Sequence, residues 1–477
     1  MTTSVLSLLA ALILASVHIS RAQNSAIYYL RPTPSNGLQL ARINQDGSAD
    51  QIVNAGLPVP SFPSWTKDGT VLALTSSNPQ RPSKISQDVY AYSPATGTSR
   101  LVVPFEDMVT VEPVFSGGVK IGERNKFTYV VPVYKSFSPD RKRIVVASLV
   151  TSGFYQTQQP PFLESLSGTS QTPLLQIYNV ADGTPQELVV IGRIRTFYTL
   201  GGFGVDWHPT QNILVASVDT DGPTVGTSAP SESAALFLIE AVPSALPSGK
   251  YRQLSHPKGF YQITQFGLIT STESDYAPAF SPDGQTVAYL RAENTVDGSG
   301  SVVQHRPISV TIRAVNLDGS NDRVILPLAA GVFSSQVTWS PNGQQLVFDT
   351  GRQPAPQPLQ LAKLEADPST LELSIVNADG TNPHLLRGPA AGIPAWQPGV
   401  QAAGAPRLSI RLNQGDPTTL VVSWPSVTQN VTLESSAAVG AAANWKPLQA
   451  QIASANGQSS ATIPITAASG YIRIRLL

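Results

Sequence analysis

The sequence predicts an all-β protein: a six-bladed β-propeller closed by N- and C-terminal strands and followed by a small β-sandwich. Two turn signatures support this prediction, because each occurs six times between residues 26 and 399 and the two alternate strictly. The composition supports it too, since 36 Gly and 40 Pro residues are spread along the chain of 477 residues. They supply turns for many short strands. Six four-stranded antiparallel units in a row are typical of a propeller.

The first signature is a tight hairpin that begins each unit. Its clearest copy spans Ala279 to Leu290 and reads AFSPDGQTVAYL. Pro282 presets φ at the first turn position, Gly284 supplies a positive φ, and the residues that follow alternate as in a strand. We expect the turn carboxylate Asp283 and its equivalents to hold turns and the aromatic residue of each copy to be buried. These aromatic anchors are Trp65, Phe137, Trp207, Phe280, Trp339 and Trp396.

The second signature is an apolar strand, an Asx-Gly type of turn, and another strand. Asp-Gly between apolar runs is a strong hairpin signal. One unit is therefore strand A, the tight turn, strand B, a long connection, strand C, the second turn and strand D. Four copies carry a plain Asp-Gly, at Asp46-Gly47, Asp182-Gly183, Asp318-Gly319 and Asp379-Gly380.

The ends of the repeat predict how the ring closes. The sixth unit has strand A at Ile393 to Trp396 and then stops, while residues 26–54 supply three strands. One C-terminal strand would pair with three N-terminal strands, which removes the edges of an open array. A degraded hairpin copy at Pro113 to Val119 leaves too little room before Phe137 for another blade. We interpret it as an insertion.

Residues 1–22 look like a secretory signal. Val5 to Val17 is an apolar run too short for a comfortable membrane span, and Ser20 and Ala22 are small residues before the expected cleavage point. We therefore expect export, to the periplasm or the medium, with no membrane span after cleavage. The alternative is an uncleaved anchor, because Met1 to Ser4 carries no Lys or Arg.

The propeller is expected to span residues 23–399, and a small-residue linker follows at 400–406. Residues 407–477 carry six or seven short segments in which apolar and polar residues alternate as in β-strands, which favours a β-sandwich. Its expected core anchors are Trp424 and Trp445.

Composition and motifs exclude several functions. The 31 basic and 31 acidic residues balance, which argues against a nucleic-acid partner, and there is no cysteine. No nucleophile elbow, Walker A loop, Rossmann fingerprint or histidine pair with zinc spacing occurs. Asp219 and Asp221 begin a calcium-type loop but lack the later ligands, so we favour a plain turn. No cofactor and no metal are expected.

The long connections point to one rim of the propeller as the functional surface. They fall almost entirely in two classes, which lie on the face opposite the tight turns. The B–C connections include about 151–173, 220–233, 291–307 and 351–370, and the D–A connections include about 106–135, 193–205 and 255–276. Long loops on a rigid scaffold are where binding usually occurs. The alternative is that the aromatic residues of these loops only pack them onto the blades. The candidate binding residues are Arg195, Tyr198, Asp206, Tyr261, Glu273, Asp275 and Tyr276.

The repeated hairpin, seen best at Phe280 to Gly284 and at Trp339 to Gly343, resembles the repeats of TolB-like (WD40-like) propellers. The resemblance covers about residues 26–399 and implies the fold, not a function. The C-terminal segment, with Ser423-Trp424-Pro425 and Tyr471 to Leu476, looks like the fibronectin-III-like tails of exported bacterial proteins.

The sequence therefore predicts an exported, monomeric, non-catalytic binding protein that docks a protein segment or a glycan of the cell envelope. One alternative is a glycan hydrolase or lyase that acts at the channel mouth, with Asp206, Glu273 and Asp275 as candidate carboxylates. A third hypothesis is a surface spacer or adhesion component without a small ligand.

Overall fold

The computed structural model shows an all-β protein in two compact units. Asn24–Gly399 forms one unit, and the strands after Val400 belong to the other. None of the described residues forms a helix that could cross a membrane. The structure describes residues 26–33, 38–155, 166–188, 204–219, 234–241, 251–264, 267–298, 304–352, 371–388, 391–398, 409–413, 416–425, 431–436, 446–448, 450, 452–455, 458–464 and 471–476.

The first unit consists, in its described part, of six antiparallel sheets, which we call blades 1 to 6. Blade 1 contains β27 (Gly392–Trp396), β1 (Ala26–Pro32), β2 (Leu38–Asn44) and β3 (Gln51–Ile52), and blade 2 contains β4 (Ser61–Trp65), β5 (Leu72–Ser76), β6 (Asp88–Ser93) and β7 (Thr98–Val103). Blade 3 contains β8 (Met108–Ser116), β9 (Val119–Phe137), β10 (Arg143–Tyr155), β11 (Leu166–Asn179) and β12 (Pro185–Leu188).

The remaining blades follow the same order along the chain. Blade 4 contains β13 (Val205–Trp207), β14 (Ile213–Asp219), β15 (Ala234–Glu240) and β16 (Tyr251–Gln253). Blade 5 contains β17 (Gly259–Thr264), β18 (Gly267–Phe280), β19 (Thr286–Gly298), β20 (Gln304–Asn316) and β21 (Arg323–Pro327). Blade 6 contains β22 (Val332–Phe333), β23 (Val337–Trp339), β24 (Gln345–Arg352), β25 (Glu372–Asn377) and β26 (His384–Arg387).

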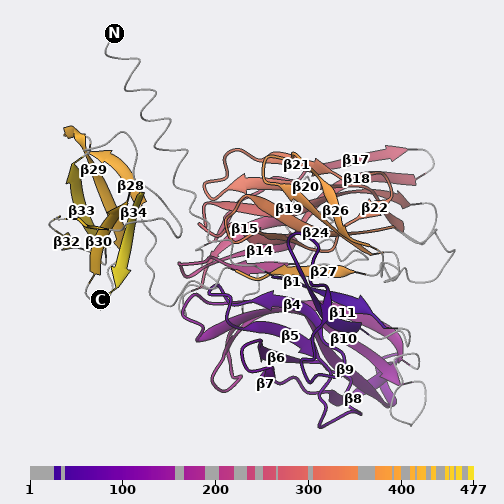
Figure 1. Ribbon diagram of the computed structural model, residues 1–477. Helices are drawn as coiled ribbons and strands as arrows, with labels where there is room; N and C mark the ends of the chain where they lie inside the picture. The colour runs from indigo at the N-terminus through magenta and orange to yellow at the C-terminus, as the bar shows by residue number, and fades with distance from the viewer. Residues whose placement is uncertain are drawn as a thin grey trace. The chain divides into compact units, whose positions relative to one another are not determined.

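The first strands of the six units lie next to one another in a circle. Contacts run from β27 to β4, β9, β13, β18 and β23 in turn, and from β23 back to β27. The strand at the C-terminal end of the repeat, β27, pairs with β1, with Ile27 opposite Trp396 (Figure 1). The all-β propeller that the sequence predicts is therefore present, and blade 1 combines strands from both ends of the repeat.

The aromatic anchors are all buried, and two of them also bond to the blade before their own. Trp207 has no exposed surface, and the other five are at most 7% exposed. The Trp65 indole N–H donates to the carbonyl oxygen of Ala395 in blade 1, at 3.3 Å. The Trp339 indole N–H donates to Ala279 in blade 5, at 3.0 Å. An anchor thus fills the gap between two blades and fixes their spacing.

The second turn signature also makes contacts between blades. Gly183 and Gly380 have φ of 70° and 86°, which favours glycine. A Cβ on Gly183 would lie 2.6 Å from the carbonyl oxygen of Val102, and one on Gly380 would lie 2.4 Å from that of Ile325. Both oxygens belong to strand D of the preceding blade. Glycine is therefore required by packing as well as by the turn.

The carboxylates of the tight hairpins hold their turns. Asp283 accepts hydrogen bonds from the Ser281 hydroxyl, at 2.5 Å, and from the backbone N–H of Gln285, at 3.0 Å. Asp140 is bonded in the same way, and the Ser138 hydroxyl lowers the pKa of its carboxyl. These residues have the geometry of turn-capping groups, not of catalytic ones.

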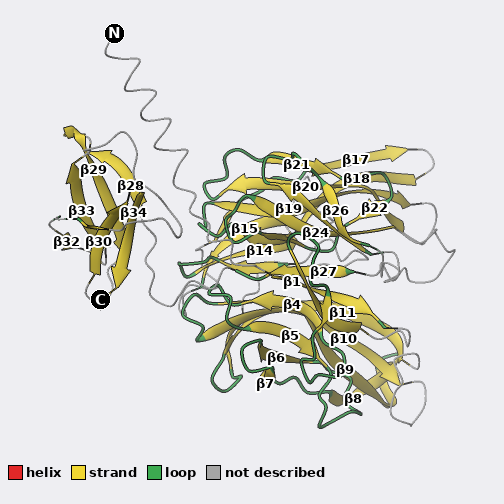
Figure 2. Ribbon diagram, viewed as in Figure 1, coloured by secondary structure: helices red, strands yellow, loops and turns green. Residues whose placement is uncertain are grey.

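Several segments expected to be long connections are strands instead. Most of 106–135 forms β8 and β9, most of 255–276 forms β17 and part of β18, and β19 and β20 extend into 291–307 (Figure 2). The reason is local, since Thr128-Tyr129-Val130 and similar runs are rich in residues that favour strands. The predicted insertion around Pro113 is thus the β8–β9 hairpin.

The second unit contains two antiparallel sheets. One has the order β28 (Ser409–Asn413), β29 (Asp416–Pro425), β33 (Gln458–Pro464) and β32 (Ile452–Ala455), and the other has β31 (Lys446–Pro447), β30 (Val431–Ser436) and β34 (Tyr471–Leu476). Val422, Leu433, Ala461 and Ile463 form a core shared by both sheets, as in a β-sandwich. The side chain of Trp424, all of Trp445, the signal at 1–22 and the linker at 400–406 lie outside the described residues.

We expect Trp339→Ala to destabilise the propeller by about 3–5 kcal/mol, because it removes a buried ring between two blades. Trp339→Phe keeps most of the ring and loses only the indole hydrogen bond, so it should cost less. Urea unfolding followed by circular dichroism measures both free energies. A loss below about 1 kcal/mol for Trp339→Ala would contradict the packing role of this anchor.

Candidate functional site

The predicted binding residues fall in two separate places in the described structure. Asp206 lies on the innermost strand of blade 4, beside the ring axis. Glu273, Asp275 and Tyr276 lie on β18 in blade 5. Arg195, Tyr198 and the side chain of Tyr261 lie outside the described residues.

Asp206 connects the inner strands of four blades. Its Oδ1 accepts bonds from the Lys67 ammonium of blade 2, at 2.6 Å, and from the Ser136 hydroxyl of blade 3, at 2.7 Å. Its Oδ2 accepts a bond from the backbone N–H of Phe280 in blade 5, at 2.9 Å. Both oxygens are therefore occupied by protein donors.

Lys67 is the partner that the sequence interpretation missed. It follows Thr66 at the hairpin position where the five other copies carry proline: Pro139, Pro209, Pro282, Pro341 and Pro398. This replacement of the repeated proline by lysine was the signal in the sequence that could have pointed to a special role of Lys67. Lys67 follows strand β4 at its tight turn, so the ion pair with Asp206 links blades 2 and 4, which are not neighbours in the ring, on the turn side.

Tyr134 spans the interior of the ring. It lies on β9 in blade 3, and its hydroxyl donates to the carbonyl oxygen of Ser335, at 2.9 Å. Ser335 precedes β23 of blade 6, which is opposite blade 3 in the circle of six. Burial raises the pKa of the Tyr134 hydroxyl far above its ordinary value, with Asp349 acting in the same direction. A side chain and not open space therefore joins these two sides of the ring.

Lys135, next in the chain, is a buried amine without a carboxylate among its described partners. It is 2% exposed, and its Nζ donates to the carbonyl oxygen of Phe62, at 2.5 Å, and to the Thr75 hydroxyl, at 2.8 Å. Burial lowers its pKa well below the ordinary 10.5. Lys135 joins blade 3 to blade 2.

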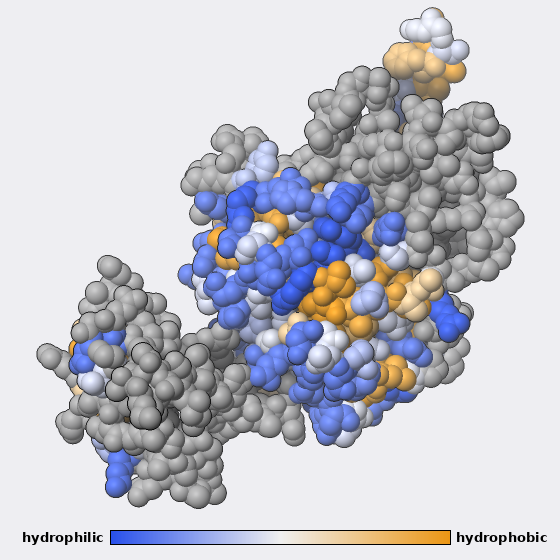
Figure 3. Space-filling view, turned by 90° about the horizontal axis from the view of Figure 1, so that it is seen from above, coloured by the Kyte–Doolittle hydropathy of each residue, from blue (hydrophilic) through white to orange (hydrophobic). Residues whose placement is uncertain are grey.

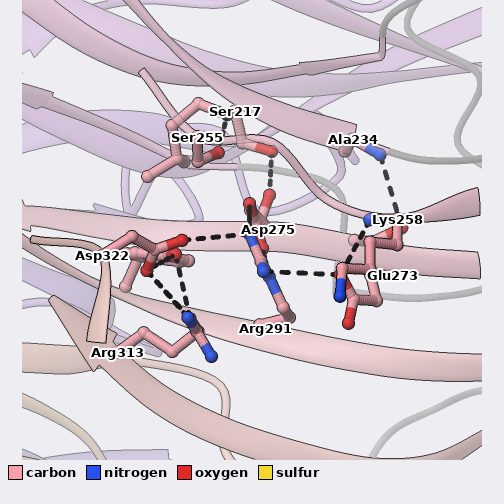
Figure 4. A network of polar contacts seen from close by, with 12 residues as sticks. Ser217, Ala234, Ser255, Lys258, Glu273, Asp275, Arg291, Arg313 and Asp322 are labelled. Carbon is pink, nitrogen blue, oxygen red and sulfur yellow. Dashed lines mark hydrogen bonds and ion pairs between the residues drawn. The ribbon is translucent and has the colours of Figure 1, made fainter. Parts of the chain in front are cut away.

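The candidate residues of blade 5 form a polar network around Arg291 (Figure 4). The Arg291 guanidinium binds both carboxylate oxygens of Asp275, at 2.6 and 2.7 Å. It also lies 3.4 Å from Glu273 and 3.8 Å from Asp322. Asp275 has no exposed surface and Tyr276 only 3%. The structure thus places both residues inside the protein, where a ligand has no access to them.

The network joins blades 4 and 5. Ser217 of blade 4 donates its hydroxyl to the backbone oxygen of Asp275, at 2.6 Å. Burial raises the pKa of the Asp275 carboxyl, although Arg291 acts against this. Burial also acts to lower the pKa of Arg291, but the bonds and charge of Asp275 outweigh it and raise that pKa. Asp275 is the counterion of a buried arginine.

The described carboxylates do not form a catalytic pair. Glycoside hydrolysis uses two carboxyl groups that face one bond, roughly 5–10 Å apart. Asp275 binds Arg291 with both oxygens, and Glu273 accepts a bond from the backbone N–H of Lys258, at 2.7 Å. Asp206 shares no partner with either. Within the described part of the chain, no three His, Asp or Glu side chains gather as metal ligands. Asp221 lies outside that part, as does the side chain of Asp219.

Comparison with known proteins gives structural likeness alone. No protein-family model and no curated protein matches the chain. TolB from Acinetobacter baumannii has a TM-score of 0.47 and 14% identity, over 81% of this chain and 70% of that one. A putative TolB from Agrobacterium tumefaciens has a TM-score of 0.34 and 13% identity, over 64% of this chain and 82% of that one. An oligogalacturonate lyase in complex with manganese has a TM-score of 0.37 and 10% identity, over 92% of this chain and 86% of that one. Since these scores lie below 0.5, the fold assignment rests on the sheet topology above.

We expect Arg291→Met to destabilise the protein by about 3–5 kcal/mol, because it leaves the buried Asp275 carboxylate without its counterion. The double variant Asp275→Leu with Arg291→Met should recover most of that loss, since it removes both charges. Urea unfolding of the wild type, both single variants and the double variant measures this coupling. Additive losses in the double variant would contradict a buried ion pair.

Lys135 should make stability depend on pH. A lowered pKa in the folded state means that the unfolded chain binds the extra proton, so stability falls as pH drops from about 10.5 to the folded pKa. Below that pKa the loss is complete and constant. Lys135→Met removes the titrating group, so the stability of the variant relative to wild type should increase as pH falls through this window. Thermal unfolding between pH 6 and pH 11 tests this, and a pH-independent difference would exclude it.

Proposed function

We propose that the protein is an exported, monomeric, non-catalytic binding protein whose propeller docks a protein segment or a glycan on its loop-side rim. The observation that supports this most is the state of the described candidate carboxylates. Asp206 and Asp275 have both oxygens occupied by protein donors, and Glu273 is held by the backbone of Lys258 and by Arg291. A catalytic carboxylate needs a face that is free for substrate.

The geometry of the ring supports the loop side as the docking face. On the turn side, Lys67 and Asp206 link blades 2 and 4, and Tyr134 connects blades 3 and 6 across the interior. The long strands of blades 3 and 5 extend away from the tight turns, so they reach toward the opposite rim. A ligand would therefore meet the rim and not pass through the ring.

Export rests on residues 1–22 and gives the class of partner. An exported chain without cysteine meets proteins and glycans of the cell envelope or the medium, and the balanced charge of the chain disfavours nucleic acid. The competing hypothesis is a glycan hydrolase or lyase, and the experiment below separates the two.

We expect the full chain to release no product from a panel of polysaccharides and to capture a defined partner from envelope or medium extracts, identified by mass spectrometry. Asp206→Asn and Glu273→Gln serve as test variants, and Asp46→Asn, at an exposed hairpin turn, is the matched control. Polysaccharide cleavage that survives in Asp46→Asn and is lost in a folded Asp206→Asn or Glu273→Gln variant would establish the enzyme instead.

A further inference from the structure

Blade 3 carries a two-stranded extension beyond the rest of its sheet. β8 pairs with β9 from Met108 opposite Thr128 to Ser116 opposite Val119. Pairing of β9 with β10 begins only at Lys126, opposite Phe154. Among the described residues, 119–125 of β9 therefore pair with β8 alone. We call residues 108–125 the β8–β9 arm; its strands are labelled at the lower edge of Figure 1.

The arm exposes an unusual amount of apolar surface. Among the described residues, 13 large hydrophobic side chains are exposed, and six of them are in the arm. The other seven are spread over the rest of the described residues, and the face seen in Figure 3 shows hydrophilic residues around a hydrophobic patch. A two-stranded ribbon is marginal by itself in water, and exposed apolar patches mark interaction sites. The six residues are Met108, Val109, Val111, Phe115, Val119 and Ile121, each 53% to 66% exposed.

Several apolar side chains of β8 lie on one face of the strand, because they are spaced two residues apart. Residues two apart on a strand point to the same face, so Val109, Val111 and Pro113 share one face of β8. Glu112 points to the other face, together with its cross-strand neighbour Arg124. One face of β8 therefore presents an apolar stripe without a charge of its own.

The charged side chains of the arm are paired with charges inside the arm or with Lys126, the residue that follows it. Glu112 lies 3.1 Å from Lys126 and 3.9 Å from Arg124, and Glu123 lies 2.6 Å from Lys120. Both carboxylates of the arm therefore have cationic partners, and a charged occupant would compete with existing pairs. An uncharged, apolar occupant therefore fits the arm better than a charged one, because it leaves these ion pairs intact and covers the exposed apolar side chains.

The backbone of β8 provides a free edge. β8 is the last strand in the sheet order β12-β11-β10-β9-β8, and no described strand pairs with its outer side. Such an edge can accept one more strand, whose main chain bonds to it while alternate side chains fit its face. Pro113 lacks an N–H, so the ladder would be interrupted there, and the apolar stripe would set the register.

We propose that β8 binds an extended, uncharged segment of a partner protein, which adds to blade 3 as an extra strand and covers the apolar stripe. This rests on the proposed binding function and narrows its ligand to a protein segment of about the length of β8, which has nine residues.

The test uses the full chain and a phage library of random decapeptides. Panning on wild type, with depletion on Val111→Lys, should enrich uncharged sequences with alternating apolar residues. The best peptide is then synthesised and its binding measured by fluorescence anisotropy. We expect Val111→Lys to weaken binding at least tenfold. The matched control Val324→Lys changes a valine of similar exposure on the edge strand β21 and should bind as wild type does. N-methylation of alternate peptide nitrogens should abolish binding, since it blocks edge pairing.

Three outcomes would overturn the proposal: no enrichment on wild type, equal binding by Val111→Lys, or undiminished binding of both N-methylated registers. Sedimentation equilibrium adds a fourth, because self-association lost in Val111→Lys would mean that a second copy covers the arm. If Val111→Lys still captures the envelope partner of the wild type, the arm proposal fails while the rim-binding function stands. If neither protein captures a partner, the function itself fails.

Discussion

The structure depends on the contact that each blade makes with the blade before it, because a closed ring needs the same spacing at every step. Two kinds of contact between neighbouring blades set that spacing. The Trp65 and Trp339 indoles fill the gap and bond to the inner strand of the preceding blade, and Gly183 and Gly380 let a turn press against its outer strand. The repeated residues therefore encode contacts between blades as much as hairpins within them. This is why glycine stands at turns where a positive φ alone would also admit asparagine.

Polar groups near the axis complete the same contacts. The Thr75 and Ser217 hydroxyls, at equivalent positions on strand B, donate to backbone oxygens of Pro132 and Asp275 on the inner strand of the next blade. Asp349, at the same position in blade 6, accepts a bond from the backbone of Ile393. Buried polar groups must find partners, and in a ring the partner is the neighbouring blade. Asp206 and Asp275, which look catalytic in the sequence, are thus used for assembly.

The sequence predicts what is local and misses what joins distant segments. The hairpins at Phe280 and Trp339 follow from a few adjacent residues, and their repetition is enough to predict the propeller. The Lys67–Asp206 pair and the Asp275–Arg291 pair arise only when blades or strands are brought together, so Asp275 resembles an exposed site residue until its burial is known. The β8–β9 arm was expected as an insertion, but its strand pairing was not. Two strands without a repeat partner give no periodic signal.

The length of the edge strands gives the β8–β9 arm its significance. Proteins protect sheet edges by keeping edge strands short. The described edge strands β3, β16, β26, β21, β7 and β17 are all shorter than β8, with two, three, four, five, six and six residues. β8 has nine and carries exposed valines in place of the lysines that usually guard such an edge. Such an edge promotes aggregation unless something covers it. A partner strand would remove this hazard and would cover the exposed apolar side chains of the β8–β9 arm.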